Sequence, residues 1–300
     1  MNLITILGPT AVGKTSLAAR LAQKFEGEII SADSRQVYRG MDIGTGKDLG
    51  DYIVDGQKIP YHLIDIAGPN EEFNLYRFQE FFYKAFYEIT SRGKMPFLTG
   101  GTGLFLDAVL RSYNMKEAIK SEEYLLELDL LSLEELKTRL IKANPKLHNT
   151  TDLLEKKRII DAIRIAESSG IKSPFPEVKI DPLVIGVRLE RREIKERITR
   201  RLKQRLQEGM IDEVKLLLEQ GVSYERLDLF GLEYRFIGQY LKGSLSYNDM
   251  YQKLNSAIHA FAKRQMTWFR KMEREGVNIN WIEGPDFEEA SLIIEQNLSK

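Results

Sequence analysis

A glycine-rich phosphate-binding loop near the N-terminus constrains this chain more than any other feature. In a G-x-x-x-x-G-K-T loop between a strand and a helix, backbone N–H groups surround a diphosphate and the lysine reaches its outer oxygens. The threonine hydroxyl binds Mg²⁺, and the N-terminus of the following helix attracts the anion. The loop predicts a phosphorylated ligand with Mg²⁺ at Thr15, and a glycine-rich turn without a ligand is the alternative. It follows the apolar run 3–7 and consists of Gly8, Pro9, Thr10, Ala11, Val12, Gly13, Lys14 and Thr15.

Length and composition narrow the class of protein. The 300 residues have a formal net charge of zero and include no cysteine. A chain without cysteine has no disulfide framework, no thiolate zinc site and no cysteine nucleophile, which fits the reducing cytoplasm. No apolar stretch reaches the ~18 residues of a membrane span, and the N-terminal strand leaves no room for a signal peptide. We therefore expect a cytoplasmic protein with no membrane association.

Predicted strands and helices alternate in the N-terminal part of the chain, and a similar pattern returns after residue 182. This alternation is typical of a parallel sheet flanked by helices, so the phosphate loop predicts an α/β fold like that of the P-loop NTPases. The predicted strands are 3–7, 28–32, 61–66, 95–99, 183–188 and 277–282. The predicted helices are 15–25, 73–91, a basic helix after 188, 211–219, 233–241 and 247–275.

The middle of the chain has a different character, with segments rich in Leu, Lys and Glu. Helices are predicted over 117–143 and 151–168, and Ser132 with Glu135 forms a capping box that begins one of them. A linker containing glycine and proline follows. We interpret this part as a small all-helical domain, 113–179, inserted into a P-loop α/β core domain formed by 1–112 and 180–300.

Two basic stretches stand out against the neutral total charge. Residues 188–205 carry nine basic and three acidic side chains, and a second stretch begins at Lys263 and Arg264 and contains two aromatic residues. Solvated helix faces with i,i+4 ion pairs explain such stretches. Basic residues interleaved with aromatics also suit a nucleic-acid groove. The sequence alone leaves both interpretations open.

Polar residues follow the predicted strands where ligands bind in open α/β sheets. Asp33 comes directly after the strand 28–32, so it should lie beside the phosphate loop. Its carboxylate could act as a general base, hold Mg²⁺ or cap a turn. Gln36 could read a base edge. Asp65 is interpreted as a structural cap, and the three histidines lack metal-ligand spacing.

Several motifs together resemble those of the tRNA dimethylallyltransferases, also called tRNA isopentenyltransferases. The phosphate loop is shared with many kinases, whereas the blocks that contain QVYRGMDIGT and TWFR are distinctive of that family. The resemblance covers nearly the whole chain. The matching segments are GPTAVGKT at 8–15, ADSRQVYRGMDIGT at 32–45, YHLID at 61–65, GGTGLF at 100–105 and AKRQMTWFR at 262–270.

The resemblance implies transfer of a dimethylallyl group from dimethylallyl diphosphate to N6 of the adenosine 3′ of the anticodon. Asp33 would be the general base, because an exocyclic amine is a poor nucleophile until its proton is removed. Lys14, the loop amides and Mg²⁺ at Thr15 would neutralise the departing diphosphate. Thr10 would add a further contact to the diphosphate or substrate.

The expected partners are tRNA and the prenyl diphosphate, and we expect a monomer. The target adenosine must leave its stack to reach the cavity. The residues expected to bind tRNA come from the loop after the second strand, the glycine loop after residue 99, the inserted helices and the second basic stretch. They are Asp33, Ser34, Arg35, Gln36, Thr102, Lys156, Lys157, Arg158, Lys263 and Arg264.

Some positions depart from the family pattern. Arg35 stands where typical members have Met or Ala, and Gly46-Lys47-Asp48 replaces Ala-Lys-Pro. The inserted segment is shorter than usual, and Asp161 replaces one of its arginines. Three alternatives therefore stay open, namely an adenylate isopentenyltransferase that uses a free nucleotide, a P-loop small-molecule kinase and a non-catalytic tRNA-binding paralogue.

Overall fold

The chain forms two compact units, each with its own hydrophobic core. The computed structural model describes residues 1–113, 121–143, 156–168 and 178–299. The larger unit comprises Met1–Ser112 and Val178–Lys300, and the smaller one comprises Tyr113–Glu177. Within the described residues, no helix is both long and apolar enough to cross a membrane.

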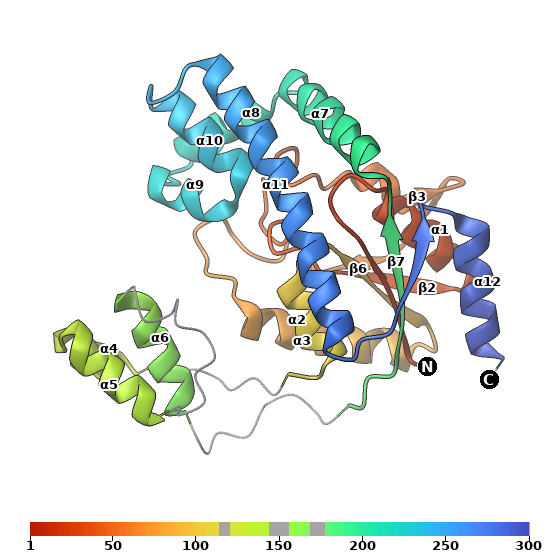
Figure 1. Ribbon diagram of the computed structural model, residues 1–300, viewed down its shortest axis with the longest axis horizontal. Helices are drawn as coiled ribbons and strands as arrows, with labels where there is room; N and C mark the ends of the chain where they lie inside the picture. The colour runs from red at the N-terminus through yellow and green to blue at the C-terminus, as the bar shows by residue number, and fades with distance from the viewer. Residues whose placement is uncertain (114–120, 144–155, 169–177, 300) are drawn as a thin grey trace. The chain divides into compact units, whose positions relative to one another are not determined.

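A six-stranded parallel sheet forms the centre of the larger unit (Figure 1). Its central strands are buried on both faces, as expected for parallel strands that helices cover on either side. The predicted α/β class, with a parallel sheet flanked by helices, is confirmed. In spatial order the strands are β5 (Tyr61–His62), β2 (Gly27–Ser31), β6 (Met95–Gly100), β1 (Leu3–Leu7), β7 (Pro182–Arg188) and β8 (Ile279–Glu283).

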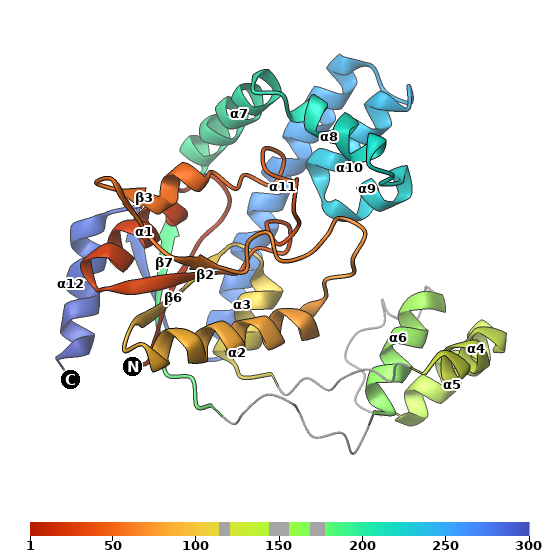
Figure 2. The ribbon, with the colours of Figure 1, turned by 180° about the vertical axis from the view of Figure 1, so that it is seen from behind.

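Helices cover both faces of this sheet (Figures 1 and 2). One group packs through aliphatic side chains such as Leu17 and Ile294, and the other through aromatic side chains such as Phe78 and Phe82. On one face lie α1 (Lys14–Lys24) and α12 (Phe287–Leu298), and on the other lie α2 (Leu75–Ser91), α3 (Gly103–Leu110) and the C-terminal part of α11 (Tyr247–Arg274).

A group of helices beyond the carboxyl ends of the strands has a second core (Figure 1). Its centre includes Phe230, Tyr234 and Met250, which are almost fully buried. Because the phosphate loop also lies at the carboxyl end of the sheet, this helical group adjoins it. The group comprises α7 (Arg191–Gln207), α8 (Met210–Glu219), α9 (Tyr224–Phe230), α10 (Leu232–Leu241) and the N-terminal part of α11.

The smaller unit contains three short helices, α4 (Glu122–Leu130), α5 (Leu133–Ala143) and α6 (Lys156–Ala166). The prediction of one helix over 117–143 is wrong, because the helix is interrupted between α4 and α5. At the break the Ser132 backbone N–H donates to Glu135 Oε2 at 2.8 Å, and the Glu135 N–H donates to Ser132 Oγ at 3.3 Å. The predicted capping box is therefore confirmed, and it starts α5. Residues 117–120 of the first predicted helix and 151–155 of the second lie outside the described residues.

The sequence analysis missed several elements of the larger unit. The strand expected over 61–66 ends at His62, because Leu63 and Asp65 have φ values of 64° and 56°, which a strand cannot contain. The elements not predicted are α3, α9, α12, the 3₁₀ helix η1 (Leu49–Tyr52) and the hairpin of β3 (Ile53–Val54) and β4 (Gln57–Lys58).

Candidate active site

A cavity of about 730 Å³ lies at the carboxyl ends of β1, β2 and β6, within the larger unit. The sequence analysis placed candidate residues after each of these strands, and the structure brings them together around this space. Helices α7, α10 and α11 close the other sides. The lining includes Thr10, Lys14, Thr15, 33–36, 99–103, Arg201, Arg205, 228–235, Ile258, Phe261, Arg264, Gln265 and Trp268.

The phosphate loop presents Lys14 to this cavity at the start of α1. Gly13 immediately precedes the helix with a φ of 87°, a conformation that favours glycine. The Lys14 ammonium donates to the Pro9 carbonyl at 3.3 Å. Burial lowers the pKa of Lys14 to about 8, the negative charge of Asp33 acts in the opposite direction, and Arg201 lowers it further. An anion bound beside Lys14 would stabilise its protonated form.

Gln265 ties the phosphate loop to the glycine loop after β6, and the sequence analysis missed this role. Its Oε1 accepts a hydrogen bond from the Thr10 N–H at 2.9 Å, and its Nε2 donates to the Gly101 carbonyl at 2.8 Å. The oxygen and the NH₂ group of this buried side-chain amide on α11 therefore both have protein partners. Its position inside AKRQMTWFR was the available signal, although nothing in one sequence reveals a partner 255 residues away.

Asp33 has two roles in the geometry of the site. Its Oδ1 accepts hydrogen bonds from the backbone N–H groups of Arg35 at 2.8 Å and Gln36 at 3.4 Å, which is a turn cap. The same half-buried side chain lines the cavity together with Lys14. The turn is also attached to the glycine loop, because the Ser34 N–H donates to Thr102 Oγ1 at 3.1 Å. Asp33 therefore caps this turn and also lines the cavity beside the phosphate loop.

The amide of Gln36 is held by protein groups on both sides. Its Oε1 accepts from the Ser31 hydroxyl at 3.3 Å, and its Nε2 donates to the Gly46 carbonyl at 3.0 Å. These bonds fix the orientation of the side chain at the cavity wall. One N–H of the Gln36 amide therefore has a protein acceptor before any base is bound.

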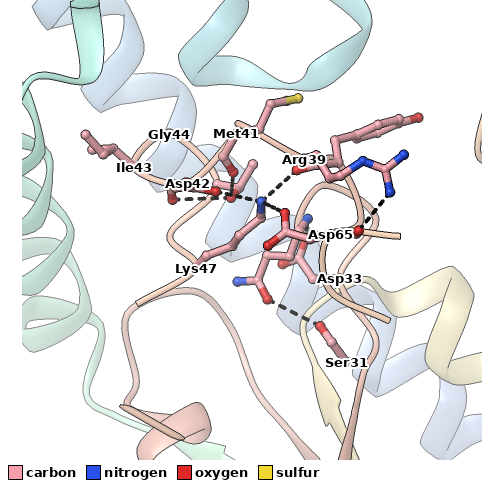
Figure 3. Close-up of polar contacts among 12 residues, drawn as sticks. Ser31, Asp33, Arg39, Met41, Asp42, Ile43, Gly44, Lys47 and Asp65 are labelled. Carbon is pink, nitrogen blue, oxygen red and sulfur yellow. Dashed lines mark hydrogen bonds and ion pairs between the residues drawn. The ribbon is translucent and has the colours of Figure 1, made fainter. Parts of the chain in front are cut away.

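A buried lysine, to which the sequence analysis assigned no role, organises the 38–47 loop. The Lys47 side chain is 1% exposed, and its Nζ donates to the Tyr38 carbonyl at 2.6 Å and to Asp42 Oδ1 at 2.7 Å. It also pairs with the Asp65 carboxylate, so the side-chain partner of Asp65 is a lysine and not the capped backbone N–H that the sequence suggested (Figure 3). Lys47 therefore joins the two ends of the 38–47 loop to the segment after β5.

Glu213 on α8 holds the same loop from the other side. Its Oε2 accepts from the N–H groups of Asp42 and Ile43, each at 2.7 Å, and its Oε1 accepts from Gly44 N–H at 3.0 Å. The Tyr234 hydroxyl donates to the same Oε1 at 2.7 Å. Burial, together with the Glu213 charge, raises the pKa of Tyr234 well above its usual value. The hydroxyl therefore remains a donor to Glu213.

The basic stretch 188–205 divides into residues with different surroundings on α7. Arg192 and Arg197 make i,i+4 ion pairs with Glu196 and Glu193, as the solvated-face interpretation expects. Two other arginines of the helix line the cavity and donate to Asp48 Oδ2, Arg201 at 2.7 Å and Arg205 at 3.4 Å.

The remaining predicted tRNA-binding residues are distributed between the two units. Lys263 is exposed on α11, whereas Arg264 lines the cavity with its guanidinium 5.8 Å from the centre of the Phe261 ring. Lys156 is exposed at the start of α6 in the smaller unit. The side chains of Lys157 and Arg158 lie outside the described residues.

The residues at the phosphate loop suit Mg²⁺, which prefers oxygen ligands and keeps several waters or phosphate oxygens. The Thr15 hydroxyl lines the cavity beside Lys14, and across the described ranges it makes no hydrogen bond to the protein. The described residues contain no cluster of three or more His, Cys, Asp or Glu that could hold a metal ion by themselves. A magnesium ion here would have one protein ligand, the Thr15 hydroxyl, and would take its other ligands from the diphosphate and water.

The Lys47 ion pairs give a testable stability prediction. We expect Lys47→Met to lower the free energy of unfolding by about 2 kcal/mol, because it leaves the Tyr38 carbonyl and two carboxylates without their donor. The loss is below the value for a fully buried pair, since both aspartates are partly exposed. Urea unfolding measures it, with Lys215→Met as the control, because that lysine has only a surface pair with Asp212. Equal stability of the two variants would contradict this role.

Comparisons with known proteins match almost the full length of this chain. The IPP transferase family model matches residues 36–272, and the isopentenyl transferase model matches residues 1–59. The tRNA dimethylallyltransferase 1 of Geotalea uraniireducens (strain Rf4) is 56% identical over 94% of this chain and 93% of its own length. The tRNA dimethylallyltransferase 1 of Syntrophus aciditrophicus (strain SB) is 52% identical over 99% and 98%.

Two solved structures are similar to this chain over almost its full length. The full-length tRNA isopentenylpyrophosphate transferase from Bacillus halodurans is 35% identical, with a TM-score of 0.70 over 99% of this chain and 95% of that one. A eukaryotic dimethylallyltransferase acting on tRNA is 22% identical, with a TM-score of 0.74 over 99% and 77%, and supports the fold alone. By its family match, its relatives and its fold, this chain belongs to the tRNA dimethylallyltransferase family of IPP transferases.

Proposed function

We propose that this prenyltransferase moves a dimethylallyl group from dimethylallyl diphosphate to N6 of the adenosine 3′ of the anticodon in tRNA. The names of its relatives support the reaction and the nucleic-acid substrate. The observation that carries the proposal is that Lys14 and Asp33 line one cavity and interact electrostatically. A group that binds the leaving diphosphate and a group that accepts a proton are thus close together.

The reaction follows from this arrangement. The N6 lone pair forms a bond to C1 of the dimethylallyl group, and the C1–O bond breaks with its electron pair going to the diphosphate. Asp33 takes the N6 proton as the C–N bond forms. Lys14 and the loop N–H groups stabilise the charge that develops on the diphosphate, and Thr10 contacts it from within the loop. Mg²⁺ held by Thr15 and the diphosphate would supply further positive charge.

The walls of the cavity suit both substrates. Ile258, Phe261 and Trp268 give α11 an apolar face toward the cavity, where a five-carbon prenyl chain could be shielded from water. The charged lining contains six basic and three acidic side chains, so it has a surplus of positive charge. The 113–179 unit, with Lys156, Lys157 and Arg158, is included in the proposal as a tRNA-binding domain.

The test is to incubate the protein and Mg²⁺ with labelled dimethylallyl diphosphate and either bulk tRNA or AMP. We expect label in tRNA and none in AMP. Label in AMP would identify an adenylate isopentenyltransferase, and binding of tRNA without transfer would identify a non-catalytic paralogue. Phosphorylation of a small molecule from ATP, without any prenyl transfer, would identify a kinase.

Exposed basic residues give a prediction about tRNA affinity. We expect Arg200→Glu combined with Lys203→Glu on α7, or Lys263→Glu on α11, to weaken tRNA binding about tenfold at low salt. The slope of log affinity against log salt should fall by about one per lost phosphate contact, and diphosphate binding should be spared. Filter binding over a salt series measures this, with Lys84→Glu on α2 as the control. Unchanged affinity and slope would leave these residues as solvated helix faces.

A further inference from the structure

Two arginine side chains that line the cavity, those of Arg35 and Arg264, make no hydrogen bond or ion pair within the described residues; Arg264 lies over the Phe261 ring, whereas Arg35 interacts electrostatically with Asp33. Arg201 and Arg205 share Asp48, and Arg235 donates to the Asp228 carbonyl at 2.9 Å. A half-buried guanidinium has five donors and is costly to leave without an acceptor. The absence of a protein partner therefore points to a ligand with acceptor oxygens.

The backbone fixes Arg35 at a short distance from the proposed base. Its N–H donates to Asp33 Oδ1 at 2.8 Å, so the turn that positions the acid also positions this arginine. The side chain lies along Gly231 at the junction of α9 and α10, where a side chain on residue 231 would come within 3.5 Å of Arg35 Nε. Gly231 has a φ of 126°, which glycine alone adopts readily, so the backbone conformation at this junction favours glycine.

The charged neighbours of Arg35 differ from those of the phosphate loop. Burial lowers the pKa of Arg35, Asp33, Tyr38 and Glu233 oppose this shift, and Arg235 adds to it. The charged neighbours that influence Lys14 are instead Asp33 and Arg201. Asp33 influences both cations. Because Arg35 lies at Gly231, between α9 and α10, whereas Lys14 begins α1, we infer that an anion beside Arg35 is a different group from the leaving diphosphate.

We propose that Arg35 binds the backbone phosphate that adjoins the target adenosine and thereby positions N6 against Asp33. The proposal rests on the proposed function, because it assumes a nucleic-acid substrate. The planar fork of arginine matches two phosphate oxygens, a geometry that lysine does not reproduce. The surplus of basic side chains in the cavity lining compensates the phosphate charge near Asp33 and Glu233.

The test combines a protein variant with a neutralised phosphate. Anticodon stem-loops are prepared with a methylphosphonate at the 5′ or the 3′ phosphate of the target adenosine, or at a stem position as the control. We expect Arg35→Met to lower kcat/KM for the unmodified stem-loop about tenfold. One flanking methylphosphonate should lower wild-type kcat/KM by a similar factor and leave Arg35→Met unchanged. Arg35→Lys should restore part of the loss, and the exposed control variant Arg274→Met should behave as wild type.

Several results would overturn the proposal. One is an Arg35→Met variant as active as wild type. Another is that the losses in kcat/KM from Arg35→Met and from the methylphosphonate multiply at both flanking positions. The third is that Arg35→Met loses affinity for inorganic pyrophosphate, which would assign Arg35 to the diphosphate. In each case wild-type transfer to the stem-loop would leave the proposed function standing. No transfer by the wild-type enzyme would overturn both.

Discussion

Replacing Asp33 by asparagine is expected to slow prenyl transfer by about 10² to 10⁴, because a carboxamide cannot accept the N6 proton. Asparagine is more informative than alanine here, since its side-chain oxygen can still accept hydrogen bonds from the N–H groups of Arg35 and Gln36. The turn, and with it the position of the nucleic acid, should therefore be retained. Single-turnover rates with saturating dimethylallyl diphosphate measure the chemical step.

The control for this experiment is the affinity for tRNA. We expect the dissociation constant of Asp33→Asn to stay within a few-fold of wild type, whereas Asp33→Ala removes the turn cap and should weaken binding as well. A near-normal single-turnover rate in Asp33→Asn would show that Asp33 serves only as the cap. A loss of affinity equal to the loss of rate would indicate a positioning role instead.

Removing the Lys14 ammonium should have the second largest effect. We expect Lys14→Ala to weaken dimethylallyl diphosphate binding and to lower the transfer rate, together by about 10² to 10³, since the charge that develops on the diphosphate loses its nearest cation. Excess EDTA should stop transfer by the wild-type enzyme, and added Mg²⁺ should restore it. Calorimetric titration with inorganic pyrophosphate separates binding from the rate.

Matched variants distinguish charge from structure at the same position. Lys14→Arg retains the charge and should retain part of the pyrophosphate affinity, whereas tRNA affinity should be similar in all Lys14 variants. Full transfer in excess EDTA would rule out the metal role assigned to Thr15. Unchanged pyrophosphate affinity in Lys14→Ala would remove this lysine from the diphosphate site.

Much of the sheet could be predicted because several of its strands are short and mostly apolar, such as LITIL in β1 and PLVIGVR in β7. The strand predicted over 3–7 has the bounds of β1, and the long helix predicted over 247–275 differs from α11 by one residue. The meeting of the phosphate loop, the Asp33 turn and the glycine loop was also predictable. Carboxyl ends of adjacent parallel strands necessarily share one edge of a sheet, and β1, β6 and β2 are adjacent.

The parts that could not be predicted depend on partners far away in the sequence. Gln265 binds Thr10 and Gly101, Lys47 binds Asp65, and Glu213 binds the amides after Met41. Each is a polar side chain on an element whose packing neighbours no local pattern reveals. The burial of Lys47 is set by the tertiary fold, so nothing in the sequence distinguishes it from a surface lysine.

The most direct test of the central claim is to locate the transferred group. Purified protein, Mg²⁺ and labelled dimethylallyl diphosphate are incubated with tRNA, which is then digested and analysed by mass spectrometry for the modified nucleoside and its position. We predict N6-dimethylallyladenosine at the position 3′ of the anticodon, and no transfer when that adenosine is replaced by purine riboside, which lacks the N6 amine. Label at another position, transfer to the purine riboside substrate or prenylation of AMP alone would contradict the account.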